Sequence, residues 1–162
     1  YMNVPNSPSL NITGDEISLA AWVKFDSVDS SAEIIIGKVA NASTHASPYF
    51  MYSLHRLGDG KLRFFITVGG NYYTVTSPSA VSAGTWYHVV GVYDGSETKL
   101  YVNNSLVAAN TSVSGNLTSD TDPLRLGING GFGEALDGTI DEIRIYNRAI
   151  TASEVSDLYN GL

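Results

Sequence analysis

Aromatic and planar polar side chains gather around residues 49–56 and 72–73, and this combination is suited to binding sugars. Aromatic rings stack on the faces of pyranose rings, while amide, guanidinium and imidazole groups form hydrogen bonds with hydroxyls. A glycine-rich segment at residues 127–133 adds an amide and a further ring. The candidate ligand-binding residues are Tyr49, Tyr52, His55, Arg56, Tyr72, Tyr73, Asn129 and Phe132.

Strand geometry divides the candidates between two faces. Side chains alternate along a strand, so Tyr52 and Arg56 are expected to share one side with Phe50. Tyr49 is expected on the other side, and only one of the two can be the ligand face. The alternative interpretation is that all of these rings are half-buried and serve packing within a sheet.

The acidic residues lack the spacing of a glycoside hydrolase site. Retaining hydrolysis needs two carboxyl groups about 5–5.5 Å apart, which on one strand face means acidic residues two positions apart. The sequence has no Glu-x-Asp-x-Glu, and Asp141 and Glu142 are adjacent, so they are expected on opposite faces. Gly-x-Ser-x-Gly is also absent, and neither Gly-Gly pair is followed by Lys-Ser or Lys-Thr. We expect no enzymatic activity.

Composition excludes several other classes. The chain has 162 residues, with 9 basic residues against 16 acidic ones and a net charge of −7. Binding to nucleic acid needs clustered Lys and Arg, so it is not expected. With no cysteine, the chain has neither disulfides nor a thiol nucleophile. Its apolar runs are far shorter than the roughly 20 residues that insert into a membrane.

Sequons for N-glycosylation are frequent. If the source glycosylates them, they mark exposed loops of an extracellular or cell-surface protein. The alternative is that they are ordinary polar turn residues. The sequons begin at Asn11, Asn41, Asn103, Asn110 and Asn116.

The elements that must carry these residues are many short strands. Residues 17–25 and 61–68 alternate between apolar and polar, while residues 86–93 are apolar on both faces. Further strands are expected at 49–56, 72–76, 99–102 and 106–109, separated by Gly- and Asn-rich turns. This pattern predicts an all-β fold with an antiparallel two-sheet β-sandwich. Trp22 and Trp86 are expected in the core, and His88 is expected to be a hydrogen-bonded buried histidine.

A helix is predicted only at the C-terminus. Thr151 and Glu154 form a capping box, Val155, Leu158 and Tyr159 recur at helical spacing, and Gly161 is a stop signal. This short C-terminal helix must pack on the sandwich to persist. Residues 41–48 and 110–123 are expected to be long polar loops.

Several blocks of the sequence together resemble a known family. Residues 4–12 and 17–24 resemble the first conserved block of laminin-G-like domains, within the concanavalin A-like lectin/glucanase superfamily. Residues 85–95 resemble the second block, residues 100–103 the strand after it, and residues 124–127 and 136–150 the third. The resemblance implies a jelly roll and one domain over residues 1–162. The N-terminal strand that usually precedes the first block is not in this sequence, so we expect either that the sequence is a trimmed piece or that another segment or chain completes that edge.

The resemblance also implies calcium, which many members of the family bind as a structural ion. Calcium takes six to eight oxygen ligands from carboxylates and backbone carbonyls. The candidate ligands are Asp141, Asp137, Asp15 and the carbonyl of Gly14. The alternative for Asp141 is a hydrogen bond within a loop.

Together these features predict a non-catalytic binding module of a larger secreted or cell-surface protein. Its expected partner is a carbohydrate or a glycoprotein. The alternative is a structural or adhesive module that binds other protein chains or other domains of the parent protein.

Overall fold

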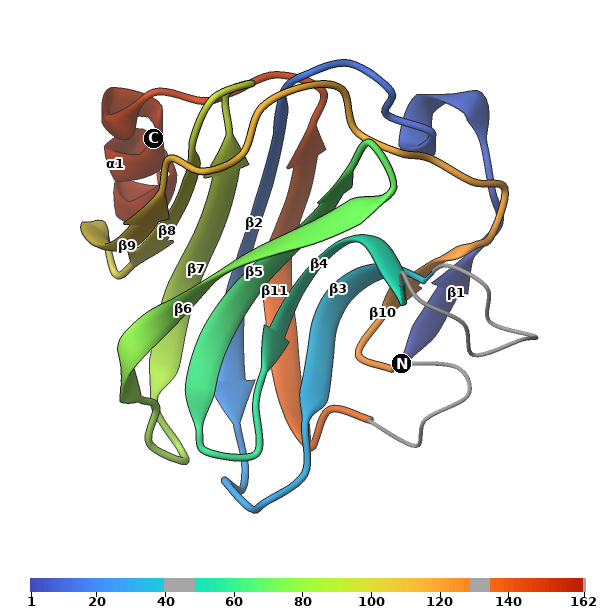
Figure 1. The fold of residues 1–162 in the computed structure, drawn as a ribbon. Helices are drawn as coiled ribbons and strands as arrows, with labels where there is room; N and C mark the ends of the chain where they lie inside the picture. The colour runs from blue at the N-terminus through green and yellow to red at the C-terminus, as the bar shows by residue number, and fades with distance from the viewer. Residues whose placement is uncertain (40–48, 129–134, 162) are drawn as a thin grey trace.

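The computed structural model describes residues 1–39, 49–128 and 135–161, and these form a two-layer β-sandwich with one short α-helix (Figure 1). Every pair of neighbouring strands is antiparallel. The predicted all-β sandwich with a C-terminal helix is confirmed. The elements are β1 (Met2–Val4), the 3₁₀ helix η1 (Pro8–Leu10), β2 (Ile17–Phe25), β3 (Glu33–Val39), β4 (Phe50–Arg56), β5 (Lys61–Val68), β6 (Asn71–Ala80), β7 (Trp86–Tyr93), β8 (Thr98–Val102), β9 (Ser105–Asn110), β10 (Leu124–Leu126), β11 (Gly138–Tyr146) and α1 (Ala152–Asn160).

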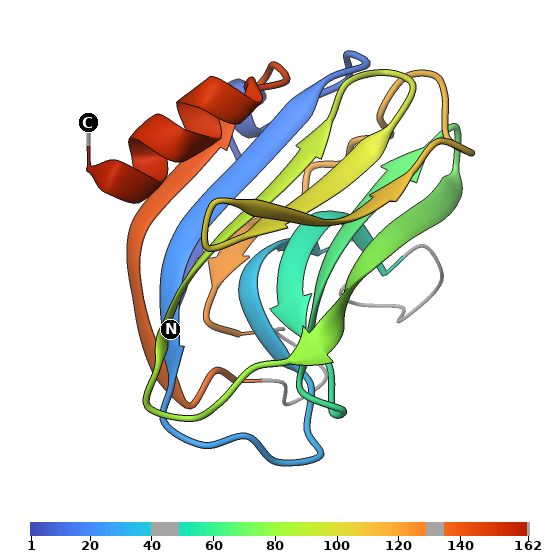
Figure 2. The ribbon, with the colours of Figure 1, turned by 90° about the vertical axis from the view of Figure 1, so that its left-hand side faces the viewer.

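The strands form a six-stranded sheet and a five-stranded sheet. The first has the order β1-β10-β3-β4-β5-β6 and the second β11-β2-β7-β8-β9. Strands β3 to β6 and β7 to β9 follow one another as meanders. By contrast, β10 lies between β1 and β3, and β2 lies between β11 and β7, so the chain crosses between the sheets as in a jelly roll. Figure 2 shows the two curved sheets stacked face to face, with α1 outside the five-stranded one.

The predicted alternation of β2 and β5 builds the core between the sheets. Five side chains of β2 and four of β5 point inward, and all are buried. The sheets approach closely where β7 passes over β5, because a Cβ atom on Gly91 would lie 2.4 Å from the Phe64 ring. Only glycine fits at this contact. The inward residues are Ile17, Leu19, Ala21, Val23 and Phe25 of β2 and Leu62, Phe64, Ile66 and Val68 of β5.

The segment between β9 and β10 is more than the polar loop that the sequence predicts. Val113 and Leu117 are buried in the core. The backbone N–H of Leu117 donates to the Gly14 carbonyl at 2.9 Å, and Leu117 also forms a bridge with Val68. Two apolar residues among many polar ones are enough to anchor this segment across the open end of the sandwich.

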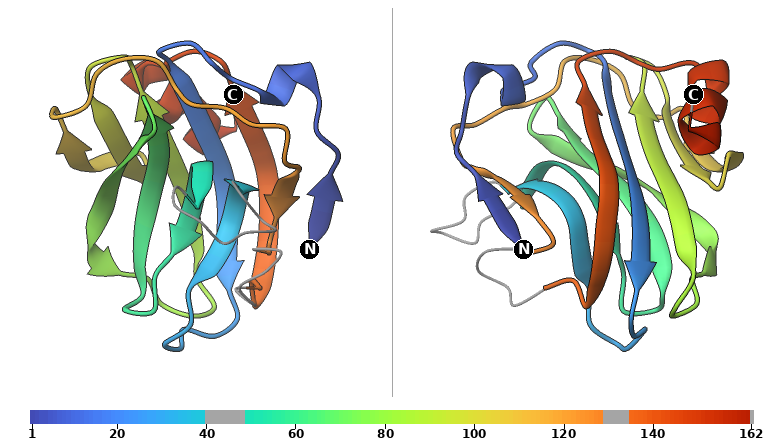
Figure 3. Two further views of the ribbon diagram at one scale, coloured as in Figure 1. Left: turned by 45° about the vertical axis from the view of Figure 1, so that its right-hand side comes forward. Right: turned by 180° about the vertical axis from the view of Figure 1, so that it is seen from behind.

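Helix α1 forms as its capping signals predict. Thr151 Oγ1 accepts from the N–H of Glu154, and the Glu154 carboxylate accepts from the N–H of Thr151. Gly161 ends the helix in the left-handed conformation at φ 74°. Val155 packs against the outer side of the five-stranded sheet, on Ala20, Val90 and Val92. Figure 3 shows that the helix covers only part of this sheet.

Candidate functional site

The outer face of the six-stranded sheet carries a row of aromatic rings that runs from β4 to β6. His55 stacks on Phe50, with ring centroids 5.8 Å apart, and Phe65 meets Phe50 edge-on at 5.6 Å. Tyr72 then stacks on Phe65 at 5.6 Å with nearly parallel planes. Phe50 and Phe65 are buried together with Ile34, whereas Tyr72 is 59% exposed. We call His55, Phe50, Phe65 and Tyr72 the aromatic row.

A β-bulge in β4 decides which rings reach this face. Tyr52 pairs with Lys38, but Phe50 pairs with Val39, so Met51 is an extra residue on β4. Met51 and Tyr52 both enter the core, and Phe50 turns outward. The expectation that Phe50 shares a side with Tyr52 is therefore wrong, because it assumed unbroken alternation.

Tyr52 and Arg56 lie between the sheets rather than on a ligand face. Tyr52 is buried and its hydroxyl donates to the Leu10 carbonyl at 3.0 Å. Burial raises its pKa, and the Asp120 carboxylate adds to that rise. Both Tyr52 and Arg56, two of the predicted ligand residues, thus serve packing within the protein.

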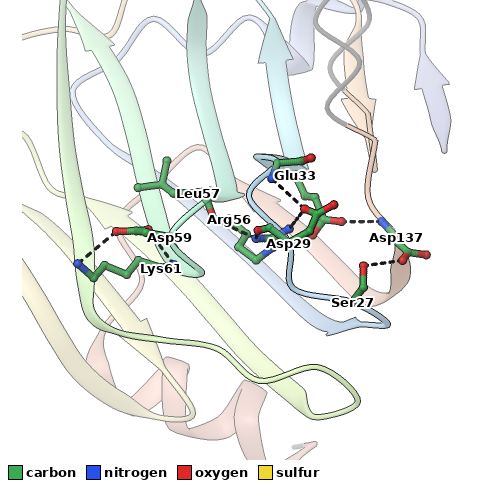
Figure 4. Close-up of polar contacts among 9 residues, drawn as sticks. Ser27, Asp29, Glu33, Arg56, Leu57, Asp59, Lys61 and Asp137 are labelled. Carbon is green, nitrogen blue, oxygen red and sulfur yellow. Dashed lines mark hydrogen bonds and ion pairs between the residues drawn. The ribbon is translucent and has the colours of Figure 1, made fainter.

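The Arg56 guanidinium has no solvent exposure and is fully engaged. Its Nε donates to Glu33 Oε2 at 2.7 Å, and Nη1 donates to the carbonyls of Asp29 and Leu57, each at 3.0 Å (Figure 4). The Phe25 ring lies 5.6 Å from its central carbon. An arginine satisfied in this way by the protein is a structural residue.

His55 and Tyr73 are also mostly withdrawn from solvent. His55 is 6% exposed and its Nδ1 lies 3.0 Å from Ser53 Oγ. Burial lowers the pKa of His55 to about 3, and the nearby Arg63 charge acts in the same direction, so the ring is neutral at pH 7. Tyr73 packs against the core. Asn129 and Phe132 lie outside the described residues.

Tyr49 and Tyr72 remain exposed among the predicted ligand residues. Tyr49, which precedes β4, is 43% exposed. On the same face as Tyr72, Arg63 Nε donates to Thr76 Oγ1 at 3.1 Å. Two tyrosines of the predicted set therefore stay exposed. Tyr72 stacks on the buried ring of Phe65 and does not lie among the predicted polar residues.

Arg125 is a residue of this face that the sequence did not single out. It pairs with Asn3 and Gly37 on the neighbouring strands, and the two leucines that flank it point into the core. It is 9% exposed, and its Nε and Nη1 have no hydrogen-bond partner among the residues that the structure describes. The only available signal was the Leu-Arg-Leu alternation, which sends the arginine outward.

The four candidate calcium ligands do not form one site. Asp15 precedes β2, whereas Asp137 lies near the other end of that strand, where Gly138 pairs with Phe25. Nine strand residues at about 3.3 Å each separate these two positions. Asp141 lies within the edge strand β11 and pairs with Trp22, and its Oδ1 accepts from the N–H of Glu142 at 2.8 Å. The Gly14 carbonyl accepts from Leu117. These residues do not fit a shared ion, and calcium binding stays a prediction.

Among the sequons that the structure describes, the asparagines differ in exposure. Asn116 and Asn103 are exposed, and Asn103 Oδ1 accepts from the backbone N–H of His88. Asn110 is half-buried and caps the N–H of Ser112, while Asn11 is half-buried with its Oδ1 enclosed. Asn41 lies outside the described residues. Glycosylation stays a prediction.

Both tryptophans lie on the outer face of the five-stranded sheet. Trp86 is 40% exposed with Lys24 Nζ 5.8 Å from its ring, so its predicted place in the core is wrong. Trp22 is half-buried on the same face, beside His88, so its predicted place in the core is wrong as well. His88 is buried as expected, but no described residue forms a hydrogen bond with its Nδ1. Strand β7 has apolar residues on both of its sides, and this pattern did not reveal that α1 covers only part of the outer face of the five-stranded sheet.

A second bulge changes the arrangement of Asp141 and Glu142. Asp141 pairs with Trp22 and Arg144 with Ala20, so β11 contains one extra residue. Ile140 and Ile143 pack on the core, and the two acidic residues between them are both exposed on the outer side. The expectation that they point to opposite faces is wrong, because Glu142 adopts a left-handed φ of 51°.

Comparison with known proteins agrees with this architecture. The family model described as the concanavalin A-like lectin/glucanases superfamily matches residues 1–156. The chain belongs to this superfamily. Comparison with curated protein sequences finds no significant match.

Solved structures similar to this concanavalin A-like domain include the following three. The binding domain of paraclostridial mosquitocidal protein 1 superposes with a TM-score of 0.76 at 16% identity, covering 98% of this chain and 40% of that one. Domain 4 of an extracellular arabinanase from Geobacillus stearothermophilus, in complex with arabinotriose, gives 0.72 at 22% identity, over 97% and 71%. The CBM40 domain of a Ruminococcus gnavus sialidase, bound to α2,3 sialyllactose, gives 0.74 at 18% identity, over 88% and 81%. At these identities the similarity establishes the fold.

Within the described residues, no helix is long and apolar enough to cross a membrane.

Proposed function

We propose that this chain is a non-catalytic carbohydrate-binding module of a secreted or cell-surface protein, with its ligand on the outer face of the six-stranded sheet. The observation that carries the proposal is Tyr72, which is 59% exposed yet stacked on Phe65. One side of its ring is fixed by a buried aromatic partner, and the other side is available to a sugar ring. Little conformational entropy is lost when a ligand stacks on a ring held in this way.

The charge of this face favours a glycan with acidic groups. The six strands of the sheet contain one carboxylate, Glu33, and it points inward to Arg56. Arg63 and Arg125 occupy outward positions. A guanidinium with two buried nitrogens that lack partners among the described residues is costly unless a ligand completes their hydrogen bonds, and a planar carboxylate is the group that fits it best. Two similar domains were crystallised with oligosaccharides, one of them an acidic one, which supports the proposal by analogy of fold.

The test is a glycan array with neutral and acidic oligosaccharides, followed by calorimetric titration of the best ligand. We expect Tyr72→Ala to weaken binding at least tenfold, and Arg125→Met to remove the preference for acidic glycans. The control is Leu106→Ala. Leu106 is also exposed, but it lies on β9 of the five-stranded sheet, so this variant should bind as the wild type does. An array without ligands, or full binding by Tyr72→Ala, contradicts the proposal.

A structural or adhesive role is the second candidate, and one observation favours it. Among the described strands, β1 pairs with β10 alone and so has an open edge, and Met2 is exposed beside a hollow of about 280 Å³ between the sheets. Apolar side chains such as Leu126 and Ile140 line the hollow. An open edge beside apolar side chains can accept a strand of another protein. Self-association in sedimentation experiments that Met2→Lys abolishes, together with an empty glycan array, would favour this role.

A further inference from the structure

A groove lies on the outer side of the five-stranded sheet, far from the aromatic row and on the opposite face of the sandwich. It has a volume of about 530 Å³ and lies between the C-terminal turn of α1 and strands β2 and β11. This size is within the range of small-ligand sites in proteins. Its lining residues are Trp22, Glu142, Arg144, Leu158, Tyr159 and Asn160, with Gly161 at one end.

The groove has an aromatic wall that is held rigidly. Trp22 and Tyr159 stack with centroids 5.5 Å apart and planes 22° apart. His88 lies against both rings, 5.2 Å from Trp22 and 5.9 Å from Tyr159. Tyr159 is 36% exposed and Trp22 is half-buried, so both rings keep surface open to the groove. An aromatic surface of this kind suits the apolar face of a sugar ring.

The polar part of the groove is balanced in charge. Glu142 and Arg144 form an ion pair across the bulge, so their charges cancel within the groove. The carboxylate accepts hydrogen bonds and the guanidinium donates them. Asn160 donates its amide N–H to the Ser156 carbonyl at 2.8 Å, which leaves the amide oxygen as an acceptor. Such a mixed set suits a ligand with several hydroxyls and no charge.

Glu142 is retained in an unfavourable backbone conformation. Its φ of 51° lies in the left-handed region, at a bulge position where glycine is the ordinary residue. The Asp141 carboxylate supports the strained peptide by accepting the Glu142 N–H at 2.8 Å. Strained residues of this kind concentrate at binding and catalytic sites, since a glycine would otherwise serve the fold better.

His88 adds a buried polar atom that the protein leaves unsatisfied. The residue is 2% exposed, and its Nδ1 has no partner within the described part of the chain, although its backbone N–H donates to Asn103. A buried nitrogen without a partner is unusual and needs a reason. Its ring touches both rings of the aromatic wall, so the unsatisfied atom belongs to the same cluster as the groove.

From these features we infer that the groove binds a neutral sugar unit, which stacks on Trp22 and Tyr159 and forms hydrogen bonds with Glu142 and Arg144. The site is separate from the proposed site on the six-stranded sheet and does not depend on it. Its ligand class differs as well, because the sheet face is cationic whereas the groove carries a balanced ion pair.

The experiment uses the two indole N–H resonances of the ¹⁵N-labelled protein, which has two tryptophans. Trp86→Phe assigns the Trp22 signal. The probes are methyl glucoside, methyl galactoside and methyl mannoside, the corresponding neutral disaccharides, and methyl glucuronide as the acidic comparison. We expect at least one neutral probe to move the Trp22 resonance in a saturable manner, and the glucuronide to bind more weakly than methyl glucoside.

Glu142→Gly is the decisive variant, because it removes the carboxylate and relieves the strain. We expect its apparent affinity to fall at least tenfold while its melting temperature rises, which shows that the fold is intact. Asn104→Gly is the matched control: Asn104 also has a left-handed φ, of 64°, but it does not line the groove. It should bind as the wild type does, and so should Tyr72→Ala.

Three results would overturn the inference. The first is that no neutral probe moves the Trp22 resonance, and the second is that Glu142→Gly binds with wild-type affinity. The third is that Tyr72→Ala abolishes the response, which would assign the sugar to the six-stranded sheet. Loss of glycan-array binding in Tyr72→Ala with a preserved Trp22 response would instead support two independent sites.

Discussion

Arg56 and Glu33 are joined by a 2.7 Å ion pair between Nε and Oε2, and both side chains are buried. The other carboxylate oxygen of Glu33 accepts from the backbone N–H of Asp137 at 2.9 Å, just before β11 (Figure 4). One carboxylate therefore connects β3 and β4 of the six-stranded sheet to the residue that directly precedes β11 of the other sheet. The ion pair therefore helps to hold the two sheets together at one end of the sandwich.

Removal of one partner should be costly. Arg56→Met leaves the Glu33 carboxylate buried without its counter-charge, and we expect the free energy of unfolding to fall by about 3–5 kcal/mol. Urea unfolding measures the change. Arg56→Met combined with Glu33→Gln should recover part of the loss. The control is Lys61→Met, which breaks the exposed 3.2 Å pair with Asp59 and should cost no more than about 1 kcal/mol. Equal losses in the two single variants would contradict this account.

Gly91 should not tolerate a side chain. The Cβ atom of Gly91→Ala would lie 2.4 Å from the Phe64 ring, so the sheets would have to separate or the ring would have to move. Overpacking of this kind costs about 1–3 kcal/mol or more, which thermal unfolding would detect as a clear drop in melting temperature. Gly14→Ala is the control, since no atom lies within 4 Å of its Cβ position. A melting temperature for Gly91→Ala equal to that of the control would show that the contact is not tight.

Residues whose environment depends on their own strand were predictable, and residues that depend on distant segments were not. The alternation of β2 and β5 assigned every inward residue correctly, because one side of each strand meets the core along its full length. Phe50 was misassigned because the bulge arises from pairing with β3. Trp86 was misassigned because its exposure depends on where the distant helix α1, which begins at Ala152, stops covering the sheet.

The candidate site was predictable only in part, for a related reason. Tyr72 was identified from its residue type and its place beside another strand with aromatic residues. Arg56 has the chemistry of a ligand-binding residue, but Glu33, 23 positions earlier, engages it in the interior. No local pattern reports such a long-range partner, and the same is true of the vacant hydrogen-bonding positions of Arg125.

The two described histidines should make the protein less stable in mild acid. Burial, with a smaller effect of Arg144, lowers the pKa of His88 to about 4, and the pKa of His55 is about 3. In the unfolded chain both titrate near 6.5, so between about pH 6.5 and 4 the unfolded state takes up protons that the native state does not. The free energy of unfolding should therefore fall as pH decreases, by up to about 1.4 kcal/mol per pH unit for each histidine.

Urea unfolding between pH 7 and pH 4.5 tests this dependence. His88→Phe removes one titrating group that faces Arg144, and its stability should decrease with about half of the wild-type slope. His55→Phe should act similarly, because it also removes one titrating group. The charged group that faces His55 is Arg63. An unchanged slope in both variants would mean that other groups control stability in this pH range.

Calcium binding can be tested by thermal unfolding with excess calcium and then with a chelator. An ion at a hundred times its dissociation constant stabilises the native state by about 2.7 kcal/mol. Because Asp141, Asp137 and Asp15 lie apart, we expect that any increase in melting temperature persists in Asp141→Ala. Loss of the increase in that variant would show that Asp141 is a ligand after all, together with oxygens other than those of the predicted set.

The extra residue in β4 has a consequence for how this strand tolerates changes in length. Upstream of Met51 the chain is one step out of phase with the part that follows. Deletion of Met51 would place Phe50 directly before Tyr52, so the ladder would become regular and Phe50 would still point outward. A one-residue deletion before Phe50 that closes the bulge would instead turn Met51 outward and Phe50 into the interior, and the aromatic row would lose the ring that connects His55 to Phe65. Among homologous chains, the surface that a shorter β4 displays therefore depends on which residue is missing.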